Sequence, residues 1–261
     1  MDFSLNKQSI AKSFSKAANS YDNAAQFQRD VGDRLLTYLP KACGSVVVDL
    51  GCGTGFFQRQ LQEKYDRPII GVDIAEGMLS FAKHHSFAGN NYWLAADAEC
   101  LPFANSSVDL IYSSMAVQWC QQLPLLFSEI KRILKPGGQF VFSTLVEGSL
   151  AELKLAWQSV DGYVHVNRFM SATHWQQTID AVDLSLNSLD VRSHRLSYQK
   201  LAQLTGELKA IGAHNMNDGR PKGLMGRKTY QQLHAGYEVF RDDDGKLPAT
   251  YQVMYGAISN G

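Results

Sequence analysis

The stretch from Val46 to Gly55 constrains the fold of this chain more than any other. Three valines lead to an acid and a leucine, and glycines then stand at alternate positions, 51, 53 and 55. A β-branched run favours a buried strand, and glycine allows positive φ angles and the close approach of a ligand to the backbone. The stretch therefore predicts a strand, a tight ligand-binding loop and the start of a helix.

The spacing of these glycines distinguishes the loop from two common nucleotide-binding loops. No Lys follows, as the phosphate-binding G-x-x-x-x-G-K-[ST] loop requires, and the glycines do not fit the dinucleotide pattern G-x-G-x-x-G. The pattern is instead G-x-G-x-G, with Asp49 two positions before the first glycine. A strand-to-helix turn that binds no ligand is the structural alternative.

Two further acids at predicted strand ends favour a cofactor site. Asp73 ends the apolar segment 68–73, 22 positions after Gly51, and Asp97 follows the short run 92–96. In βαβ nucleotide folds an acid at about this offset binds the ribose hydroxyls, and ligands of open α/β sheets lie at the carboxyl ends of the strands. We therefore expect these acids and Asp49 to converge on one edge of a parallel sheet.

The hydrophobic patterns predict one domain over 1–261 with three parts. Residues 43–146 alternate between strand and helix patterns, which predicts a doubly wound α/β core with helices on both faces of the sheet. Residues 1–42 carry two apolar helical stripes and are expected to form an N-terminal helical cap. Residues 147–261 are expected to add helices on the substrate side and the closing strands.

Several boundaries within these parts can be predicted. The polar residues 20–23 predict a break between the two N-terminal stripes, and Lys135–Gly138 are expected to end a helix before a strand at 139–144. Residues 150–182 look mostly helical, and the last two strands are expected at 191–198 and 250–258.

Charge and composition exclude several classes of protein. Lys and Arg number 25 and Asp and Glu number 25, so no overall field draws the chain to nucleic acid or to a membrane. The start of the chain lacks a signal pattern and no apolar run approaches the roughly 20 residues that span a bilayer, so we expect a cytoplasmic protein. The seven histidines and four cysteines show no metal-binding spacing, so no metal is expected.

Segments between residues 45 and 146 resemble, in order, the core of the class I S-adenosylmethionine (SAM) methyltransferases. The segments are Asp49–Gly55, Asp73, Asp97–Phe103, Asp109–Ser113 and Leu134–Gly138. The resemblance implies a mostly parallel, seven-stranded Rossmann-like methyltransferase sheet whose last strand is antiparallel, with helical lid elements. It implies SAM as cofactor and S-adenosylhomocysteine as product.

The same resemblance implies the cofactor-binding residues. Asp49 would position the cofactor's ammonium, Asp73 would accept the ribose hydroxyls and Asp97 the adenine amino group. The other residues implied at the cofactor are Gly51, Cys52, Gly53, Gly55, Ile74, Met78, Ala98 and Ser113. For Met78 the structural alternative is a core residue on a helix face.

The flanks of this core resemble a narrower family, the malonyl-acyl-carrier-protein O-methyltransferases of biotin synthesis (the BioC family). The similar segments are 6–22, 115–120 and 143–169. The resemblance implies methyl transfer from SAM to the free carboxylate of a malonyl thioester on acyl carrier protein, or on coenzyme A. Because that carrier is acidic, the cationic window 219–228 is a candidate docking segment, with a solvated loop as the alternative.

The chemistry of this reaction predicts the residue types at the acceptor. A carboxylate is already ionised at neutral pH, so the reaction needs alignment rather than a general base. Arg binds carboxylates bidentately, so Arg168, within a family-like segment, is a candidate to hold the acceptor. Tyr21, Gln118 and Trp119 are the other candidates. A surface Arg168 and core positions for Tyr21 and Trp119 are the alternatives.

Other functions stay open on the sequence alone. A class I methyltransferase of another small acceptor, such as a quinone precursor or a free carboxylic acid, would carry the same loop and acids. A SAM-binding module without catalysis is possible for the same reason. A nicotinamide dehydrogenase is disfavoured by the glycine spacing.

Overall fold

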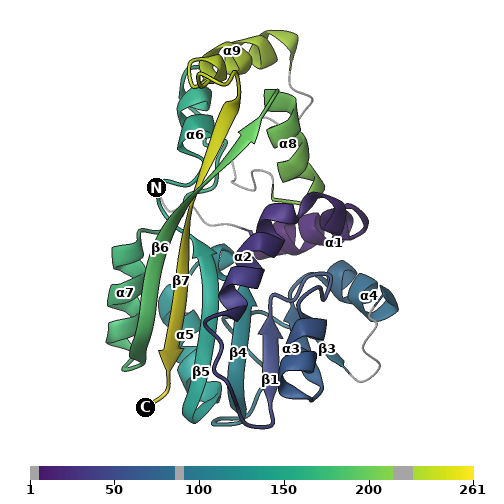
Figure 1. Cartoon of the computed structure of the whole chain (residues 1–261), viewed down its shortest axis with the longest axis vertical. Coiled ribbons are helices and arrows are strands. Elements are labelled where there is room, and N and C mark those ends of the chain that lie inside the picture. The colour runs from purple at the N-terminus through teal and green to yellow at the C-terminus, as the bar shows by residue number, and fades with distance from the viewer. Residues whose placement is uncertain (1–5, 86–90, 214–225) are drawn as a thin grey trace.

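A seven-stranded sheet organises the computed structural model, which describes residues 6–85, 91–213 and 226–261 (Figure 1). The strand order is β3-β2-β1-β4-β5-β7-β6, and β7 runs antiparallel to the other six strands. The expectation of a mostly parallel, seven-stranded methyltransferase sheet with an antiparallel last strand is therefore confirmed. The strands are β1 (Val47–Leu50), β2 (Ile69–Asp73), β3 (Tyr92–Ala95), β4 (Val108–Ser114), β5 (Leu134–Leu145), β6 (Ser185–Tyr198) and β7 (Leu247–Ser259).

Helices connect the strands and extend the structure at one end of the sheet. Those within the core are α3 (Gln58–Tyr65), α4 (Glu76–His85) and α5 (Leu123–Ile133), with the short 3-10 helix η1 (Val117–Trp119) after β4. The others are α1 (Lys7–Ala24), α2 (Gln26–Leu36), α6 (Ala151–Gln158), α7 (Ala172–Ala181), α8 (Leu201–Ala210) and α9 (Arg227–Glu238).

Both faces of the sheet are buried, as a doubly wound fold requires. Alternate residues of one strand point to opposite faces. Val47 of β1 packs with α2 and α3 in one apolar cluster, whereas Val48 packs with α5 and α7 in another. Likewise, Leu110 of β4 packs in the cluster of Val47, and Ile111 packs in the cluster of Val48. Nearly all of these side chains are fully buried, which explains the continuous apolar runs of the core strands.

Strands β6 and β7 continue beyond the rest of the sheet as a two-stranded ribbon. The residues of β7 from Val253 to Ser259 pair with β5, whereas those from Leu247 to Gln252 pair only with β6. Helices α6, α8 and α9 surround this ribbon at the top of Figure 1, above α1 and α2. Helices α6, α8 and α9 thus lie beyond the carboxyl ends of the core strands, whereas α7 packs on a face of the sheet.

Some predicted boundaries are wrong. The segment 20–23 does not break the N-terminal helix, because Ser20 donates to the Ala210 carbonyl and Asp22 accepts from Thr54, so both polar side chains gain partners while α1 continues to Ala24. The turn to α2 lies at Ala25 instead.

Two strand starts and one helical segment also differ from expectation. Strand β5 begins at Leu134, which pairs with Val108. Lys135–Gly138 therefore lie within this strand, where its pairing with β4 is irregular. Strand β6 begins at Ser185. It is an edge strand whose first residues are exposed, and most of them are therefore polar. Residues 159–171 separate α6 from α7, so 150–182 is not one helical block.

Helix α1 packs closely on α4 through a glycine. A Cβ on Gly77 would lie 2.6 Å from the Ser15 Cβ and 2.7 Å from its Cα, and the Gly77 N–H donates to the Ser15 hydroxyl at 3.1 Å. On its other side, α1 bonds to the segment after α8, since the Ser13 hydroxyl donates to the Gly212 carbonyl at 3.0 Å. Helix α1 therefore bridges the core and the upper helices. None of the helices described is long and apolar enough to cross a membrane.

This close packing makes a stability prediction. Gly77→Val should lower the free energy of unfolding by about 1–3 kcal/mol, because the new side chain meets the Ser15 backbone, which can yield only if α1 shifts. Gly206→Ala is the matched control, since Gly206 of α8 has open space around its Cβ position and Ala should stabilise a helix by roughly 0.5–1 kcal/mol. Urea unfolding followed by circular dichroism measures both. Equal stability of Gly77→Val and wild type would contradict this packing.

Candidate active site

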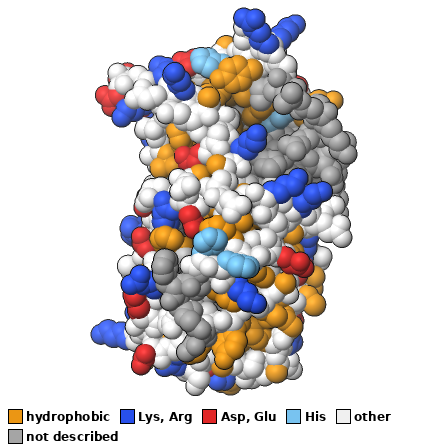
Figure 2. Space-filling view, turned by 90° about the vertical axis from the view of Figure 1, so that its right-hand side faces the viewer, with side chains coloured by type: hydrophobic (Ala, Val, Ile, Leu, Met, Phe, Trp, Pro, Cys, Tyr) orange, Lys and Arg blue, Asp and Glu red, His pale blue; other side chains and the backbone are white. Residues whose placement is uncertain are grey.

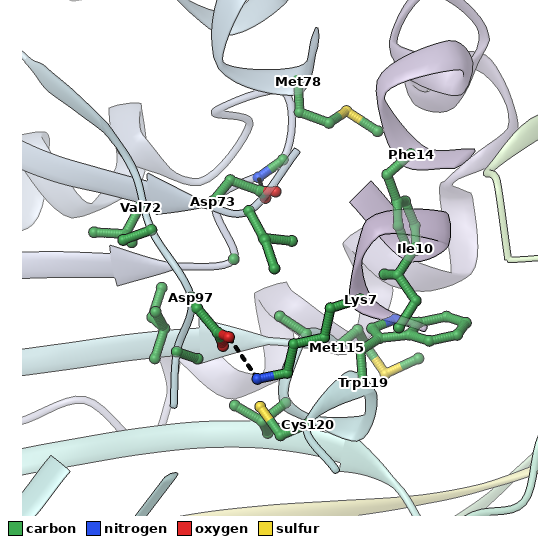
Figure 3. A pocket seen from close by; sticks show the side chains of 18 of the residues that line it. Lys7, Ile10, Phe14, Val72, Asp73, Met78, Asp97, Met115, Trp119 and Cys120 are labelled. Carbon is green, nitrogen blue, oxygen red and sulfur yellow. Dashed lines mark hydrogen bonds and ion pairs between the residues drawn. The ribbon is translucent and has the colours of Figure 1, made fainter. Parts of the chain in front are cut away.

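One cavity lies at the carboxyl ends of β1, β2 and β4, with α1 beside it (Figure 3). The expected convergence of strand ends on one edge is therefore present. Predicted cofactor residues that line this cavity are Gly51, Gly53, Asp73, Ile74, Met78, Asp97 and Ala98. Residues from α1 close the other side, and in Figure 3 Phe14 and Ile10 of this helix face Met78 and Asp73 across the cavity.

The glycine loop has one open glycine, Gly53, and two packed glycines, since a Cβ on Gly51 would meet the Cβ of Ala116. All three glycines have positive φ angles, of 73°, 54° and 78° in chain order. Around the Cβ position of Gly53 no atom lies within 4 Å, so this residue leaves space at the cavity. At Gly55 a Cβ would lie 2.6 Å from the Trp93 ring, so here glycine serves the packing of the loop. Gly53 thus leaves space for a ligand to approach the backbone of the loop.

Asp73 ties the end of β2 to the glycine loop. Its Oδ2 accepts a hydrogen bond from the Gly53 N–H at 2.9 Å, and its Oδ1 accepts from the Ala75 N–H at 2.8 Å. Burial raises the pKa of this carboxyl, and the backbone hydrogen bonds offset part of that rise. A carboxylate oxygen has two lone-pair sites, so the hydroxyls of a ribose could still be accepted here.

Asp49 is a buried acid that lacks a charged partner. It is 3% exposed, and its Oδ2 has no hydrogen-bond partner in the described parts of the chain. Burial, together with the nearby Asp73 carboxylate, raises the pKa of Asp49 to about 8. A ligand ammonium would supply both the missing donor and the missing charge. Asp49, Gly53 and Asp73 therefore fit a cofactor that carries an ammonium and a ribose.

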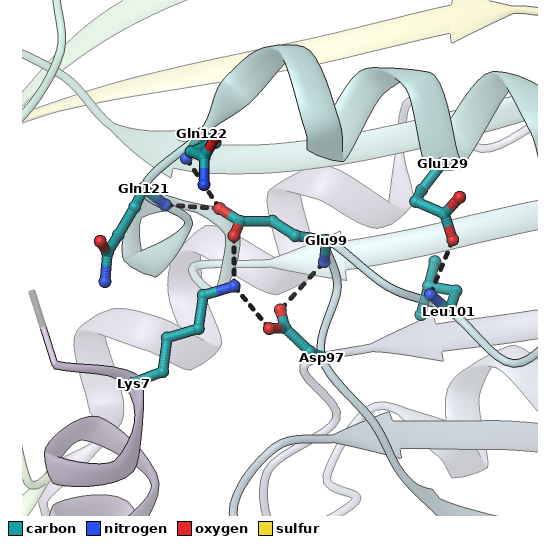
Figure 4. Close-up of polar contacts among 7 residues, drawn as sticks. All are labelled: Lys7, Asp97, Glu99, Leu101, Gln121, Gln122 and Glu129. Carbon is teal, nitrogen blue, oxygen red and sulfur yellow. Dashed lines mark hydrogen bonds and ion pairs between the residues drawn. The ribbon is translucent and has the colours of Figure 1, made fainter.

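Lys7 joins α1 to the acids after β3 (Figure 4). Its Nζ donates to Asp97 Oδ2 and to Glu99 Oε2. Although burial opposes it, these two carboxylates hold the pKa of Lys7 above its usual range. The other oxygen of Glu99 accepts from the N–H groups of Gln121 and Gln122, at 2.6 and 2.8 Å. Asp97 thus lines the cavity while it is paired with Lys7. The predicted adenine amino group would share the Asp97 carboxylate with Lys7.

The remaining predicted cofactor residues lie behind the cavity wall. The Ser113 hydroxyl is fully buried and donates to the Leu50 carbonyl at 2.7 Å, so it supports the end of β1. The Cys52 N–H donates to the Val72 carbonyl at 3.0 Å, which joins the glycine loop to β2. Four of the predicted cofactor residues do not line the cavity: Asp49, Cys52, Gly55 and Ser113.

A second cavity adjoins the first and is largely apolar. Phe14, Tyr21, Met115 and Trp119 line both cavities. The rest of its lining comes from α2, the segment 145–169, the end of α8 and Tyr251 of β7. Among the described residues that line it, none is Lys, Arg, Asp or Glu. The four shared residues therefore form a junction, at which a group could pass from a ligand in the first cavity to one in the second.

The predicted acceptor residues divide between this cavity and the surface. Tyr21 and Trp119 stand at the junction, and Gln118 lines the second cavity with its Nε2 donating to the Met115 carbonyl at 2.6 Å. Arg168 is exposed and lines neither cavity, although its neighbours Asn167 and Phe169 line the second. The structure therefore brings three of these four residues together.

Lys7 and His165 are site residues that the sequence patterns did not predict. Lys7 stands 90 residues from its partner Asp97, and this separation hides the pair. His165 lines the second cavity and pairs with Asp161 at 2.7 Å. The four-residue spacing of Asp161 and His165 is the one signal that could have found the second pair.

The surface seen in Figure 2, which is the right-hand side of Figure 1, carries mixed charge. Lys and Arg side chains are spread over its upper and lower parts, and hydrophobic side chains gather in its lower part. Of the predicted docking window, 219–225 lie outside the described residues, whereas Arg227 and Lys228 are exposed at the start of α9. No group of three His, Cys, Asp or Glu side chains suited to a metal occurs within 6–85, 91–213 and 226–261.

Comparison with known proteins agrees with this fold. The family model described as a methyltransferase domain matches residues 48–142, which include the glycine loop and most of β1 and β5. The structure of a putative methyltransferase from Bacillus halodurans C-125 has a TM-score of 0.62 at 15% identity, and covers 87% of this chain and 97% of that one. Fold and site together define a class I methyltransferase.

Curated relatives narrow this class to a family. A malonyl-[acyl-carrier protein] O-methyltransferase from Serratia marcescens is 41% identical over 254 residues, which cover 97% of this chain and 96% of the relative. A biotin biosynthesis bifunctional protein BioHC from Cellvibrio japonicus is 47% identical over 253 residues. The chain spans about half, 50%, of that bifunctional relative. The chain belongs to the malonyl-[acyl-carrier protein] O-methyltransferase family.

The burial of Asp49 makes a pH prediction for the protein without cofactor. The folded-state pKa of about 8 exceeds the ordinary value of 3.8, so folding favours the protonated acid. This contribution is complete below about pH 4 and is lost as the pH rises to about 8. The free energy of unfolding of Asp49→Asn, measured with urea, should therefore rise relative to wild type across this window and level off above it. A difference that does not change with pH would contradict an Asp49 that is buried without a partner.

Proposed function

We propose that this protein transfers a methyl group from SAM to the free carboxylate of a malonyl thioester on acyl carrier protein, an early step of biotin synthesis. The observation that carries the proposal is the likeness, over nearly the full length of both chains, to the Serratia marcescens enzyme of that name. The two adjoining cavities agree with a reaction between a bound cofactor and a separate acceptor.

The first cavity is the proposed cofactor site. Asp49 would pair with the ammonium of SAM, and Asp73 would accept its ribose hydroxyls. Asp97 and Ala98 would border the adenine at the end of β3, where Lys7 holds the carboxylate. When bound, SAM supplies a methyl group activated by a sulfonium.

The residues at the junction would align the acceptor with that methyl group. Burial raises the pKa of Tyr21, so its hydroxyl stays protonated and can donate to a carboxylate oxygen. The rings of Phe14 and Trp119 meet edge to face, with centroids 5.3 Å apart, and form an apolar wall beside it. Such alignment can supply roughly 7–11 kcal/mol of the barrier, so no general base is needed.

The apolar second cavity suits this chemistry. A carboxylate and a sulfonium attract each other before methyl transfer, and both are neutral after it. Their attraction is strong where water is excluded, because it grows as the local dielectric constant falls. The absence of Lys, Arg, Asp and Glu from the described lining leaves the two reactants as the main charges at the junction. Arg227 and Lys228 at the start of α9 are proposed to contact the acidic carrier.

A methyl-transfer assay tests the proposed function. Purified protein is incubated with SAM and malonyl-acyl carrier protein, and mass spectrometry of the carrier follows the gain of one methyl group. We expect a methyl ester that alkaline hydrolysis removes. Parallel reactions with malonyl-coenzyme A and with free malonate measure the need for the carrier and the thioester. SAM binding without any malonyl methyl ester would overturn the proposal and favour another small acceptor or a module without catalysis.

Replacement of Asp73 tests the cofactor site. Asp73→Ala should weaken SAM binding at least about tenfold, or about 1.4 kcal/mol, because the ribose loses its acceptor and the Gly53 N–H loses its partner. Asp180→Ala, at an exposed position of α7, should bind SAM like wild type. Isothermal titration calorimetry measures both. An unchanged affinity in Asp73→Ala would remove this residue from the site.

A further inference from the structure

We infer that His165 holds the carboxylate of the acceptor in the second cavity; the inference rests on the proposed function. A carboxylate that is taken out of water needs hydrogen-bond donors and, for tight binding, a positive charge. Among the described residues that line this cavity, only His165 can carry a positive charge. The remaining lining is apolar, aromatic or amide-bearing.

Two contacts fix the imidazole ring, and a third fixes the Asp161 carboxylate that it faces. Its Nε2 lies 2.7 Å from Asp161 Oδ1, and the same oxygen accepts the Tyr163 N–H at 2.9 Å. The ring stacks on Trp157, with centroids 3.6 Å apart and planes at 7°. The side chain of His165 is only 14% exposed. A ring held in this way loses little conformational freedom when it binds a ligand.

The hydrogen-bond chemistry of the pair leaves one donor for the acceptor. A protonated imidazole has an N–H on each nitrogen. Asp161 accepts from Nε2, so Nδ1 is the nitrogen that can donate to a carboxylate. The bound imidazolium then stands between two carboxylates, that of Asp161 and that of the acceptor. Such charge-assisted hydrogen bonds are about twice as strong as neutral ones.

This arrangement explains how the enzyme would distinguish substrate from product. Methyl transfer turns the carboxylate into an ester, which carries no charge and is a weaker acceptor. His165 then loses its partner in the second cavity, and the product binds less tightly than the substrate. His165 therefore acts as a specificity-determining residue that favours binding of the free acid and release of the methyl ester.

The other cations near the site are less suited to this role. Lys7 lies in the first cavity and is engaged by Asp97 and Glu99. Arg168 is exposed and lines neither cavity. Arg168→Ala is therefore the variant that distinguishes Arg168 from His165 in this role.

Selective binding of substrate over product tests the inference. The dissociation constants of malonyl-acyl carrier protein and of its methyl ester are measured by calorimetry in the presence of S-adenosylhomocysteine. We expect wild type to prefer the free acid at least about tenfold. His165→Phe keeps a flat ring against Trp157 but has no donor, and should bind both forms about equally. Its KM for the malonyl substrate should rise at least tenfold, with an unchanged dissociation constant for the methyl ester and for SAM.

Two further variants separate specificity from folding. His165→Asn retains a neutral donor and should lose only part of the preference for the free acid. His234→Asn is the matched control, because His234 also faces a carboxylate four residues away, at 3.3 Å from Glu238, but lines neither cavity. It should keep the full preference.

The outcomes distinguish this inference from the proposed function. If wild type forms the methyl ester but His165→Phe keeps the preference for the free acid, the inference is overturned and the proposed function stands. Loss of the preference in Arg168→Ala but not in His165→Phe would assign the role to Arg168. If wild type forms no malonyl methyl ester, the proposed function fails and the inference fails with it.

Discussion

The placement of α1 across the carboxyl edge of the sheet determines the rest of the site. Lys7 anchors its first turn to Asp97 and Glu99, and near its end Asp22 accepts a hydrogen bond from Thr54 of the glycine loop at 2.7 Å. Gly77 allows the close contact with α4 between these two anchors. Because Phe14 and Tyr21 belong to α1 and line both cavities, the same helix encloses the first cavity and shapes its junction with the second.

The two cavities differ in charge in a way that suits the proposed reaction. Asp73 gives the first cavity a buried carboxyl, and Asp49 lies buried near it behind the lining, where a cationic cofactor would supply the charge that Asp49 lacks. In the second, the described lining has one group able to become positive, His165, and this group already faces Asp161. The positive cofactor would thus lie near acidic groups and the negative acceptor near His165. Methyl transfer would remove the charges of both reactants. Alignment by the junction then replaces acid–base chemistry.

Sequence alone predicted the sheet, its strand-end acids and the residues that the strand ends and the glycine loop contribute to the first cavity, because each depends on a local pattern of strand, glycine or acid. The acceptor side was less predictable. The segment around Arg168 was predicted to hold the acceptor, and neighbours of Arg168 line the second cavity. The direction of an individual side chain depends on tertiary packing, however, and His165 rather than Arg168 lines the wall. Lys7 went unnoticed because its partners lie 90 and 92 residues away. The polar residues 20–23 suggested a break, yet contacts with α8 and the glycine loop keep them helical.

In the proposed reaction the acceptor carboxylate meets the cofactor at the junction of the two cavities. A crystal structure with S-adenosylhomocysteine and a malonyl thioester tests this arrangement. We expect the sulfur in the first cavity and the carboxylate in the second, facing each other between Tyr21 and Trp119. The separation should place an oxygen about 3–3.5 Å from the position of the transferred methyl carbon. A carboxylate bound outside the second cavity, or on the far side of Trp119 from the sulfur, would contradict it.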